Sequence, residues 1–353
     1  MHMSDALISP AVGGTMWLAG GGMIAYGARK MRGCLDSSRV PLMGVLGAFV
    51  FAAQMVNFTI PGTGSSGHLG GGLLLAILLG PSAGLIVIAS ILTVQAMLFA
   101  DGGLLALGCN IVNMGLLPCF IAYPLVYLPL VGKKPARGRI VLAATVAAVV
   151  GLQLGSLGVV AETTMSGIAE LPFMKFLLLM LPIHLAIGLV EGLVTAAVAA
   201  FVWQARPEVL ELTDPDDPGR GRVGLVAVCL LVAAIVTGGV VSWFASSHPD
   251  GLEWSVAKTM GTEELAEPTD GLRGALGRVQ ERTALLPDYD FAEPQDPVDD
   301  EAEPGSQEPA AGQWFSPSAG TTVSGLVGGG ITLVLAFLAG WALRRRTTSA
   351  STA

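Results

Sequence analysis

Three residues of this sequence carry nitrogen atoms that can bind a single metal ion: Met1, His2 and His68. The amino group of Met1, the backbone nitrogen of His2 and Nδ1 of its imidazole close fused chelate rings without strain. His68, in the glycine-rich stretch Pro61–Gly70, offers a fourth nitrogen. A square of nitrogens is typical of Ni(II) or Cu(II). The alternative interpretation is an ordinary amino terminus with a chance histidine, because short motifs also match by accident.

This chelate sets conditions on the chain and on the metal. Methionine aminopeptidases remove the first residue only before small side chains, so we expect Met1 to remain ahead of His2. The amide of His2 must lose its proton, which requires a metal that bonds nitrogen strongly and disfavours Mg(II) and Mn(II).

The elements that must position these residues are membrane helices. Of the 353 residues, 52% are hydrophobic and 13% are charged, and long apolar runs recur along the chain. This composition predicts an all-α polytopic membrane protein rather than a soluble enzyme. The four cysteines form no CxxC pair, which argues against a disulfide framework and against a zinc finger.

Motifs of ATP-using and hydrolytic sites are missing from the sequence. Without a GxxxxGK(S/T) phosphate loop, we expect no ATP hydrolysis by this chain. Without HExxH, an intramembrane metallohydrolase is disfavoured.

Apolar runs and turn residues predict a bundle of seven membrane spans followed by a module with two more. Ser9 and Pro10 mark the start of the first span, as N-cap and first-turn residue. Gly80-Pro81 divides the run 69–99 into two spans, because proline interrupts helix hydrogen bonds and because the division keeps the basic loops on one side. The first predicted span ends near 27. The other predicted spans cover 41–56, 69–80, 81–99, 104–128, 140–160, 173–202, 224–244 and 323–343.

The spans and the basic residues between them predict the domain organisation and the topology. The regions are a metal-binding membrane domain over 1–205, a cytoplasmic linker over 206–222, a two-span module over 223–346 with an acidic extracytoplasmic segment, and a cytoplasmic tail over 347–353. The positive-inside rule places the amino terminus outside and the carboxyl terminus in the cytoplasm, so that His68 shares the outer side with Met1. The acidic stretch 288–308 is predicted to be solvated and disordered, with a loose cation-attracting patch as the alternative.

Several polar residues are candidates for supporting the site. Asp5 would hold the His2 ring or the terminal amine, or else face solvent. Asn57, Asn110 and Asn113 are further candidates near the ligands, and the last two share a helix face at a spacing of three.

His184 and Glu191 lie seven residues apart and therefore on one helix face. Ionisable residues inside a membrane helix indicate function, and three roles compete: an ion pathway, contact with a partner subunit, or a structural pair. We favour a structural or coupling role over metal ligation, because Glu191 is expected nearer the inner side.

Several segments of this sequence resemble the CbiM/NikM family, the substrate-binding membrane subunits (S components) of cobalt and nickel importers of the energy-coupling factor type. The similar segments are Met1-His2, Ser4-Asp5-Ala6-Leu7, Met55-Val56-Asn57-Phe58, Gly67-His68-Leu69-Gly70-Gly71, Asn110 with Asn113, and His184 with Gly188-Leu189-Val190-Glu191-Gly192. The likeness covers about 1–205, although Met3-Ser4 stands where the family more often has Ile-Pro. The run His248–Glu253 carries the PDGLE signature of a CbiN/NikN-like domain, so the whole chain resembles a fused protein. This stretch would either load metal onto the amino-terminal site or serve local structure.

The resemblance implies capture and import of Ni(II) or Co(II), held as substrate in a square plane by the Met1 amine, the amide and imidazole of His2, and His68. It implies partners: two ATP-binding subunits (CbiO/NikO-like) and a coupling transmembrane subunit (CbiQ/NikQ-like), within the lipid of a bacterial or archaeal cell membrane. It also implies a link to cobalamin biosynthesis, no catalytic residues and no nucleic-acid partner. The alternative function is a stand-alone divalent metal channel or an ion-coupled carrier that uses Glu191.

Overall fold

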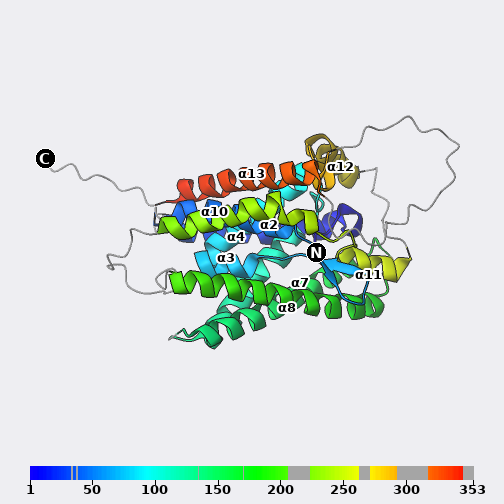
Figure 1. Cartoon of the computed structure of the whole chain (residues 1–353). Helices are drawn as coiled ribbons and strands as arrows, with labels where there is room; N and C mark the ends of the chain where they lie inside the picture. Colours follow the sequence, from blue (N-terminus) through cyan, green and yellow to red (C-terminus); the bar gives the residue numbers. More distant parts are fainter. Residues whose placement is uncertain are drawn as a thin grey trace.

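The computed structural model shows a bundle of long helices that run side by side, with the short helices α11 and α12 at one end (Figure 1). The structure describes residues 1–32, 35–36, 39–133, 135–169, 171–205, 223–261, 271–291 and 317–344. The predicted linker 206–222, the tail 347–353 and most of the acidic stretch 288–308 therefore lie outside the described residues.

Each predicted span corresponds to a helical segment. The longer helices are α1 (Pro10–Met31), α2 (Val40–Gln54), α4 (Pro81–Leu98), α7 (Arg137–Ser166), α8 (Phe173–Ala205), α10 (Val223–Gly239) and α13 (Ala319–Leu343). The shorter ones are α3 (Gly72–Leu79), α11 (Gly251–Met260), α12 (Gly271–Thr283) and three 3-10 turns, η1 (Asp5–Leu7), η6 (Val241–Phe244) and η7 (Pro287–Tyr289). One further continuous helix consists of α5 (Leu107–Asn110), the wider π-type turns η3 (Ile111–Leu116) and η4 (Pro118–Tyr127), and α6 (Leu128–Val131).

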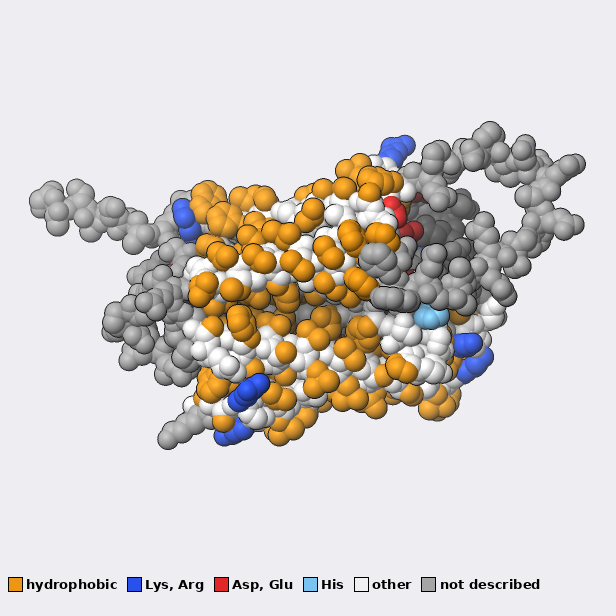
Figure 2. Space-filling model, viewed as in Figure 1, with side chains coloured by type: hydrophobic (Ala, Val, Ile, Leu, Met, Phe, Trp, Pro, Cys, Tyr) orange, Lys and Arg blue, Asp and Glu red, His pale blue; other side chains and the backbone are white. Residues whose placement is uncertain are grey.

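The helices have the length and apolar surface of a membrane protein, which confirms the predicted all-α polytopic class. Five of the described helices are long and apolar enough to cross a membrane: α4, the helix Leu107–Val131, α7, α8 and α13. Hydrophobic side chains cover the face formed by α8, α10 and α13, and Lys and Arg side chains lie toward its ends (Figure 2). Exposed apolar side chains of α8, such as Leu185 and Leu189, suit contact with lipid tails.

The break predicted at Gly80-Pro81 is present. Gly80 has φ +86°, a conformation that glycine adopts without strain, and it separates α3 from α4. The backbone of α4 at Gly84 approaches that of α3 at Leu75, so the two helices lie side by side. With eight residues, α3 is about 12 Å long, which is too short to cross a hydrocarbon core of about 30 Å.

Two helix ends illustrate how well local signals predict boundaries. α1 begins at Pro10 as predicted, and the Ser9 hydroxyl accepts a hydrogen bond from the Val12 backbone nitrogen at 3.4 Å. α7 extends to Ser166, beyond the predicted end at 160, and the polar residue Glu162 is buried within this extension.

The second module packs directly against the first. α10 and α13 both contact α2, where Gly44 and Gly47 let the backbones approach Leu333 and Thr332 of α13 closely. The far end of α13 lies beside the connection between α1 and α2, since Leu35 and Arg344 form a β-bridge.

Candidate metal centre

A short antiparallel hairpin positions His68. Strand β1 (Phe58–Ile60) pairs with β2 (Ser65–Gly67), with Phe58 opposite Gly67 and Ile60 opposite Ser65. His68 directly follows β2 and is buried. Part of the glycine-rich stretch therefore forms a strand of a hairpin, and this hairpin holds the His68 imidazole in the interior.

Glu191 of α8 holds the loop that follows His68. Its Oε2 accepts a hydrogen bond from the Gly70 nitrogen at 2.9 Å, and its Oε1 accepts one from the Gly71 nitrogen at 3.1 Å. Gly71 has φ +77°, and a Cβ there would lie 2.3 Å from Val50 Cγ1, so only glycine fits. The expected structural role of Glu191 is thus visible as a carboxylate that fixes the backbone beside His68.

The amino-terminal segment is held inside the protein by Asn110. The Met3 backbone nitrogen donates to Asn110 Oδ1 at 2.9 Å, and Asn110 Nδ2 donates to the Met3 carbonyl at 3.3 Å. The Gly103 nitrogen also donates to the Met3 carbonyl at 2.9 Å. Met3 is fully buried, so the first residues are part of the core.

The Met1 amine and His68 meet. The amine donates a hydrogen bond to His68 Nε2 at 2.9 Å, and His68 Nδ1 donates to the Leu69 carbonyl at 3.2 Å. An ammonium group can only donate, so Nε2 must be the unprotonated nitrogen of the ring. Burial first, and then the neighbouring ammonium, lower the pKa of His68, which favours the neutral ring. A nitrogen lone pair is therefore directed at the terminal amine.

The imidazole of His2 stacks on that of His68 and points Nδ1 at the carboxylate of Asp101. The two rings stack at a centroid distance of 4.9 Å and an interplanar angle of 7°. His2 Nδ1 lies 2.9 Å from Asp101 Oδ1, whereas its buried Nε2 has no hydrogen-bond partner among the described residues. Burial opposes ionisation of Asp101, but the charge of His2 and the hydrogen bonds from His2 and Tyr289 outweigh it and lower the pKa of Asp101 to about 2. Chelation by Nδ1 would require the His2 ring to rotate about its Cβ–Cγ bond.

A cavity of about 20 Å³ adjoins these nitrogens, which is room for about one water-sized species. Its lining includes Met1, His68, Asn113, His184, Glu191 and Asp250. Among the described residues, no group of three or more His, Cys, Asp or Glu side chains is arranged to hold a metal ion. A metal at this place would therefore depend on nitrogen donors of the amino terminus.

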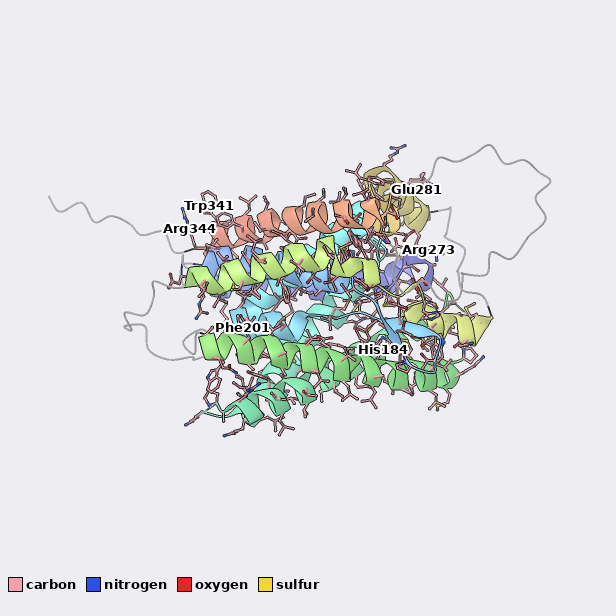
Figure 3. The ribbon with its side chains drawn as sticks, in the orientation of Figure 1. His184, Phe201, Arg273, Glu281, Trp341 and Arg344 are labelled. Atoms are coloured by element: carbon pink, nitrogen blue, oxygen red, sulfur yellow. The ribbon has the colours of Figure 1, made fainter. Side chains whose placement is uncertain are left out.

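His184 borders this cavity from α8, and Figure 3 shows it on the part of the helix far from Phe201. Its Nδ1 donates to the Met180 carbonyl at 2.8 Å, one helical turn earlier, and its buried Nε2 has no partner among the described residues. His184 and Glu191 are both buried and both line the cavity, as their shared helix face predicts.

Two of the predicted supporting residues lie elsewhere. Asp5 contacts neither the His2 ring nor the terminal amine: its Oδ1 accepts a hydrogen bond from the Ala106 nitrogen at 2.9 Å, so it anchors η1 to the segment before α5. Burial raises the pKa of Asp5, because it outweighs the hydrogen bonds that the carboxylate accepts from the Ala106 and Leu105 backbone. Asn57 contributes its backbone carbonyl, which accepts from the Ser246 nitrogen at 2.8 Å in the second module. Asn113 does border the cavity and donates to Glu162 at 2.8 Å.

Sequence reasoning linked the PDGLE stretch to the amino-terminal site as a possible metal loader, but it did not name Asp250 as a member of this cluster. Asp250, from the PDGLE stretch, accepts a hydrogen bond from the Met1 amine, and its Oδ2 lies 3.7 Å from His68 Nε2. Burial would raise the pKa of Asp250, but the ammonium and His68 outweigh it and lower that pKa well below the usual range. The motif was the available signal, but nothing in it indicates which distant residue it contacts.

Comparison with known proteins agrees with this architecture. A family model described as the cobalt uptake substrate-specific transmembrane region (CbiM) matches residues 2–209, and a PDGLE domain model matches 224–345. A chain of Archaeoglobus fulgidus that carries the name fused nickel transport protein NikMN is 31% identical over 339 residues, covering 96% of this chain and 97% of that protein. The fused nickel transport protein NikMN of Rhodobacter capsulatus is 30% identical, covering 82% and 88%.

A cobalt transport protein and a solved structure extend the comparison. The cobalt transport protein CbiM of Geobacter sulfurreducens is 28% identical, covering 77% of this chain and 81% of that one. A crystal structure of a transition metal transporter is 29% identical with a TM-score of 0.52, and it covers 59% of this chain and 95% of its own. The chain therefore belongs to the CbiM family of metal-uptake membrane proteins and carries a fused PDGLE domain.

Proposed function

We propose that this protein captures Ni(II) or Co(II) outside the cell and is the substrate-binding subunit of an ATP-driven importer. The observation that carries the proposal is the separation of 2.9 Å between the Met1 amine and His68 Nε2. Nitrogen ligands lie about 2.0–2.1 Å from a metal of this size, so two at right angles are about 2.9 Å apart. The two nitrogens are thus already spaced as neighbouring corners of a square.

The remaining corners come from His2. Its backbone nitrogen follows the Met1 amine in the chain and closes a five-membered ring with it, while its Nδ1 would bind after the ring turns away from Asp101. His68 Nε2 then lies opposite the amide nitrogen. The Leu69 carbonyl supports this assignment, because it accepts a hydrogen bond from Nδ1 of His68 and so leaves Nε2 unprotonated and free to bind metal.

The ion enters from the end of the bundle that carries α11 and α12. We place this end outside, because Arg29, Lys30 and Arg39 flank the opposite end and Leu35 lies beside Arg344 there. Energy for release inside comes from two ATP-binding subunits and a coupling membrane subunit, since the chain carries no phosphate-binding loop. Nickel and cobalt are the substrates that the names of similar proteins support.

Titration calorimetry of the purified full chain with Ni(II) and Co(II) tests the proposal. We expect His68→Ala to weaken binding more than about 100-fold, since even indirect supporting residues contribute 10–100-fold. Two residues added ahead of Met1 should have a similar effect, because the amine leaves the chelate. A single added residue is a poor test: an amine two residues before His2 forms a complete square with two amides and needs no His68.

The matched control is Glu281→Gln, which changes an exposed carboxylate on α12, the helix that also carries Arg273 (Figure 3). This variant should bind both ions as the parent does. Unchanged affinity in both His68→Ala and the two-residue extension would contradict the proposed site. Metal uptake by the chain alone in ATPase-free vesicles would favour the channel or carrier instead.

A further inference from the structure

The two carboxylate oxygens of Asp250 have separate partners. Oδ1 accepts hydrogen bonds from the backbone nitrogens of Leu252 at 2.7 Å and Glu253 at 2.9 Å, and thereby caps the start of α11. Oδ2 faces the other way, against the Met1 amine and 3.7 Å from His68 Nε2. One oxygen therefore caps a helix of the PDGLE module, and the other faces the candidate metal centre.

The hairpin that delivers His68 also fixes the position of Asp250. The Ser66 nitrogen donates to the Pro249 carbonyl at 2.8 Å, and the Ser66 hydroxyl donates to the His248 carbonyl at 2.7 Å. At the turn of the hairpin, Trp254 Nε1 donates to the Thr63 carbonyl at 3.0 Å. Since Ser66 precedes His68 by two residues and Pro249 precedes Asp250 by one, the imidazole and the carboxylate are held in a fixed relation.

The negative charge of Asp250 can balance the charge of a divalent ion bound at the candidate metal centre. A divalent ion bound by one deprotonated amide and neutral nitrogens leaves a net positive charge in a buried site. An uncompensated buried charge is strongly unfavourable. Asp250 is nearly buried, with 13% of its side chain exposed, and its Oδ2 is within contact of both nitrogens that the ion must touch.

We propose that Asp250 supplies the counter-charge for the bound metal ion, so that the substrate site spans the CbiM region and the PDGLE domain. This inference rests on the proposed function. It assigns the PDGLE aspartate to metal binding itself, in addition to its role in capping α11. By linkage, an ion that gains affinity from this contact also strengthens the docking of α11 on the hairpin.

The decisive variant is Asp250→Asn in the full chain. Asparagine keeps an oxygen that caps α11 and removes only the negative charge and the acceptor that faces the amine. Calorimetry should give Ni(II) and Co(II) affinities weakened about 10–100-fold, the range for residues that support metal ligands. Absorption bands of bound Ni(II) should keep the pattern of the parent protein, since the nitrogen square is unchanged. Glu281→Gln again serves as the control.

A second variant, Asp250→Ser, retains a capping hydroxyl and removes the arm that reaches the site, so it keeps the test decisive if the amide perturbs folding. Parental affinity in either folded variant overturns the inference. Tighter binding also overturns it, because it would show that the carboxylate only competes with the ion for the amine. The proposed function fails separately, when His68→Ala binds as the parent does.

Discussion

Glu191 provides a sharp test of how the protein positions its ligands. Its carboxylate accepts hydrogen bonds from the Gly70 and Gly71 nitrogens, immediately after His68. Glu191→Gln replaces two hydrogen bonds to a charged acceptor, worth about 1.5–3 kcal/mol each, with one neutral bond worth about 0.5–1.5 kcal/mol. The amide group also turns a donor toward a backbone donor. We expect the loop to lose about 2.5–4.5 kcal/mol of stabilisation.

The expected result is a weaker metal site in a less stable protein. Metal binding must then order the loosened loop again. If this costs about 1.4 kcal/mol of binding free energy, the metal affinity falls tenfold. Calorimetry with Ni(II) and thermal unfolding in detergent measure the two effects. In a His68→Ala background, Glu191→Gln should leave the residual metal affinity unchanged, because the positioned ligand is gone.

A different outcome would refute this reasoning. If Glu191→Gln binds metal and unfolds as the parent does, yet transport is lost, then Glu191 conducts ions or contacts a partner. The structural role would be wrong, and the carrier alternative would gain support.

Two further predictions follow from the same contacts. Asn110→Ala removes both hydrogen bonds to Met3 and should weaken Ni(II) binding about tenfold in calorimetry, whereas Asn57→Ala should leave it unchanged, since Asn57 contributes only its backbone carbonyl. Gly71→Ala should lower the unfolding temperature more than Gly62→Ala. Both residues have positive φ, where an alanine costs about 1–2 kcal/mol of backbone strain. Of the two, Gly71 is the position where the new Cβ would also meet another side chain. Equal unfolding temperatures for the two alanine variants would contradict the packing argument.

Much of the fold could be predicted because membrane helices are encoded locally. Long apolar runs, the Ser9-Pro10 start and the Gly80-Pro81 break each act within a few residues, and the structure has helices and a break at those places. The end of α7 was missed because Glu162 is polar and yet buried, where Asn113, distant in the sequence, donates a hydrogen bond to it.

One part of the candidate metal centre is predictable from the sequence, since the amine, amide and imidazole of Met1 and His2 are covalent neighbours in any fold. The sequence also predicted His68 as the fourth nitrogen, but the contact of His68 with the amine, and the presence of Asp250 beside both, depend on how the chain folds. His68 reaches the amine through a hairpin too short to recognise in a glycine-rich stretch, and Asp250 arrives from the second module. Those contacts depend on hydrogen bonds between segments far apart in the chain, which leave no periodic pattern along it.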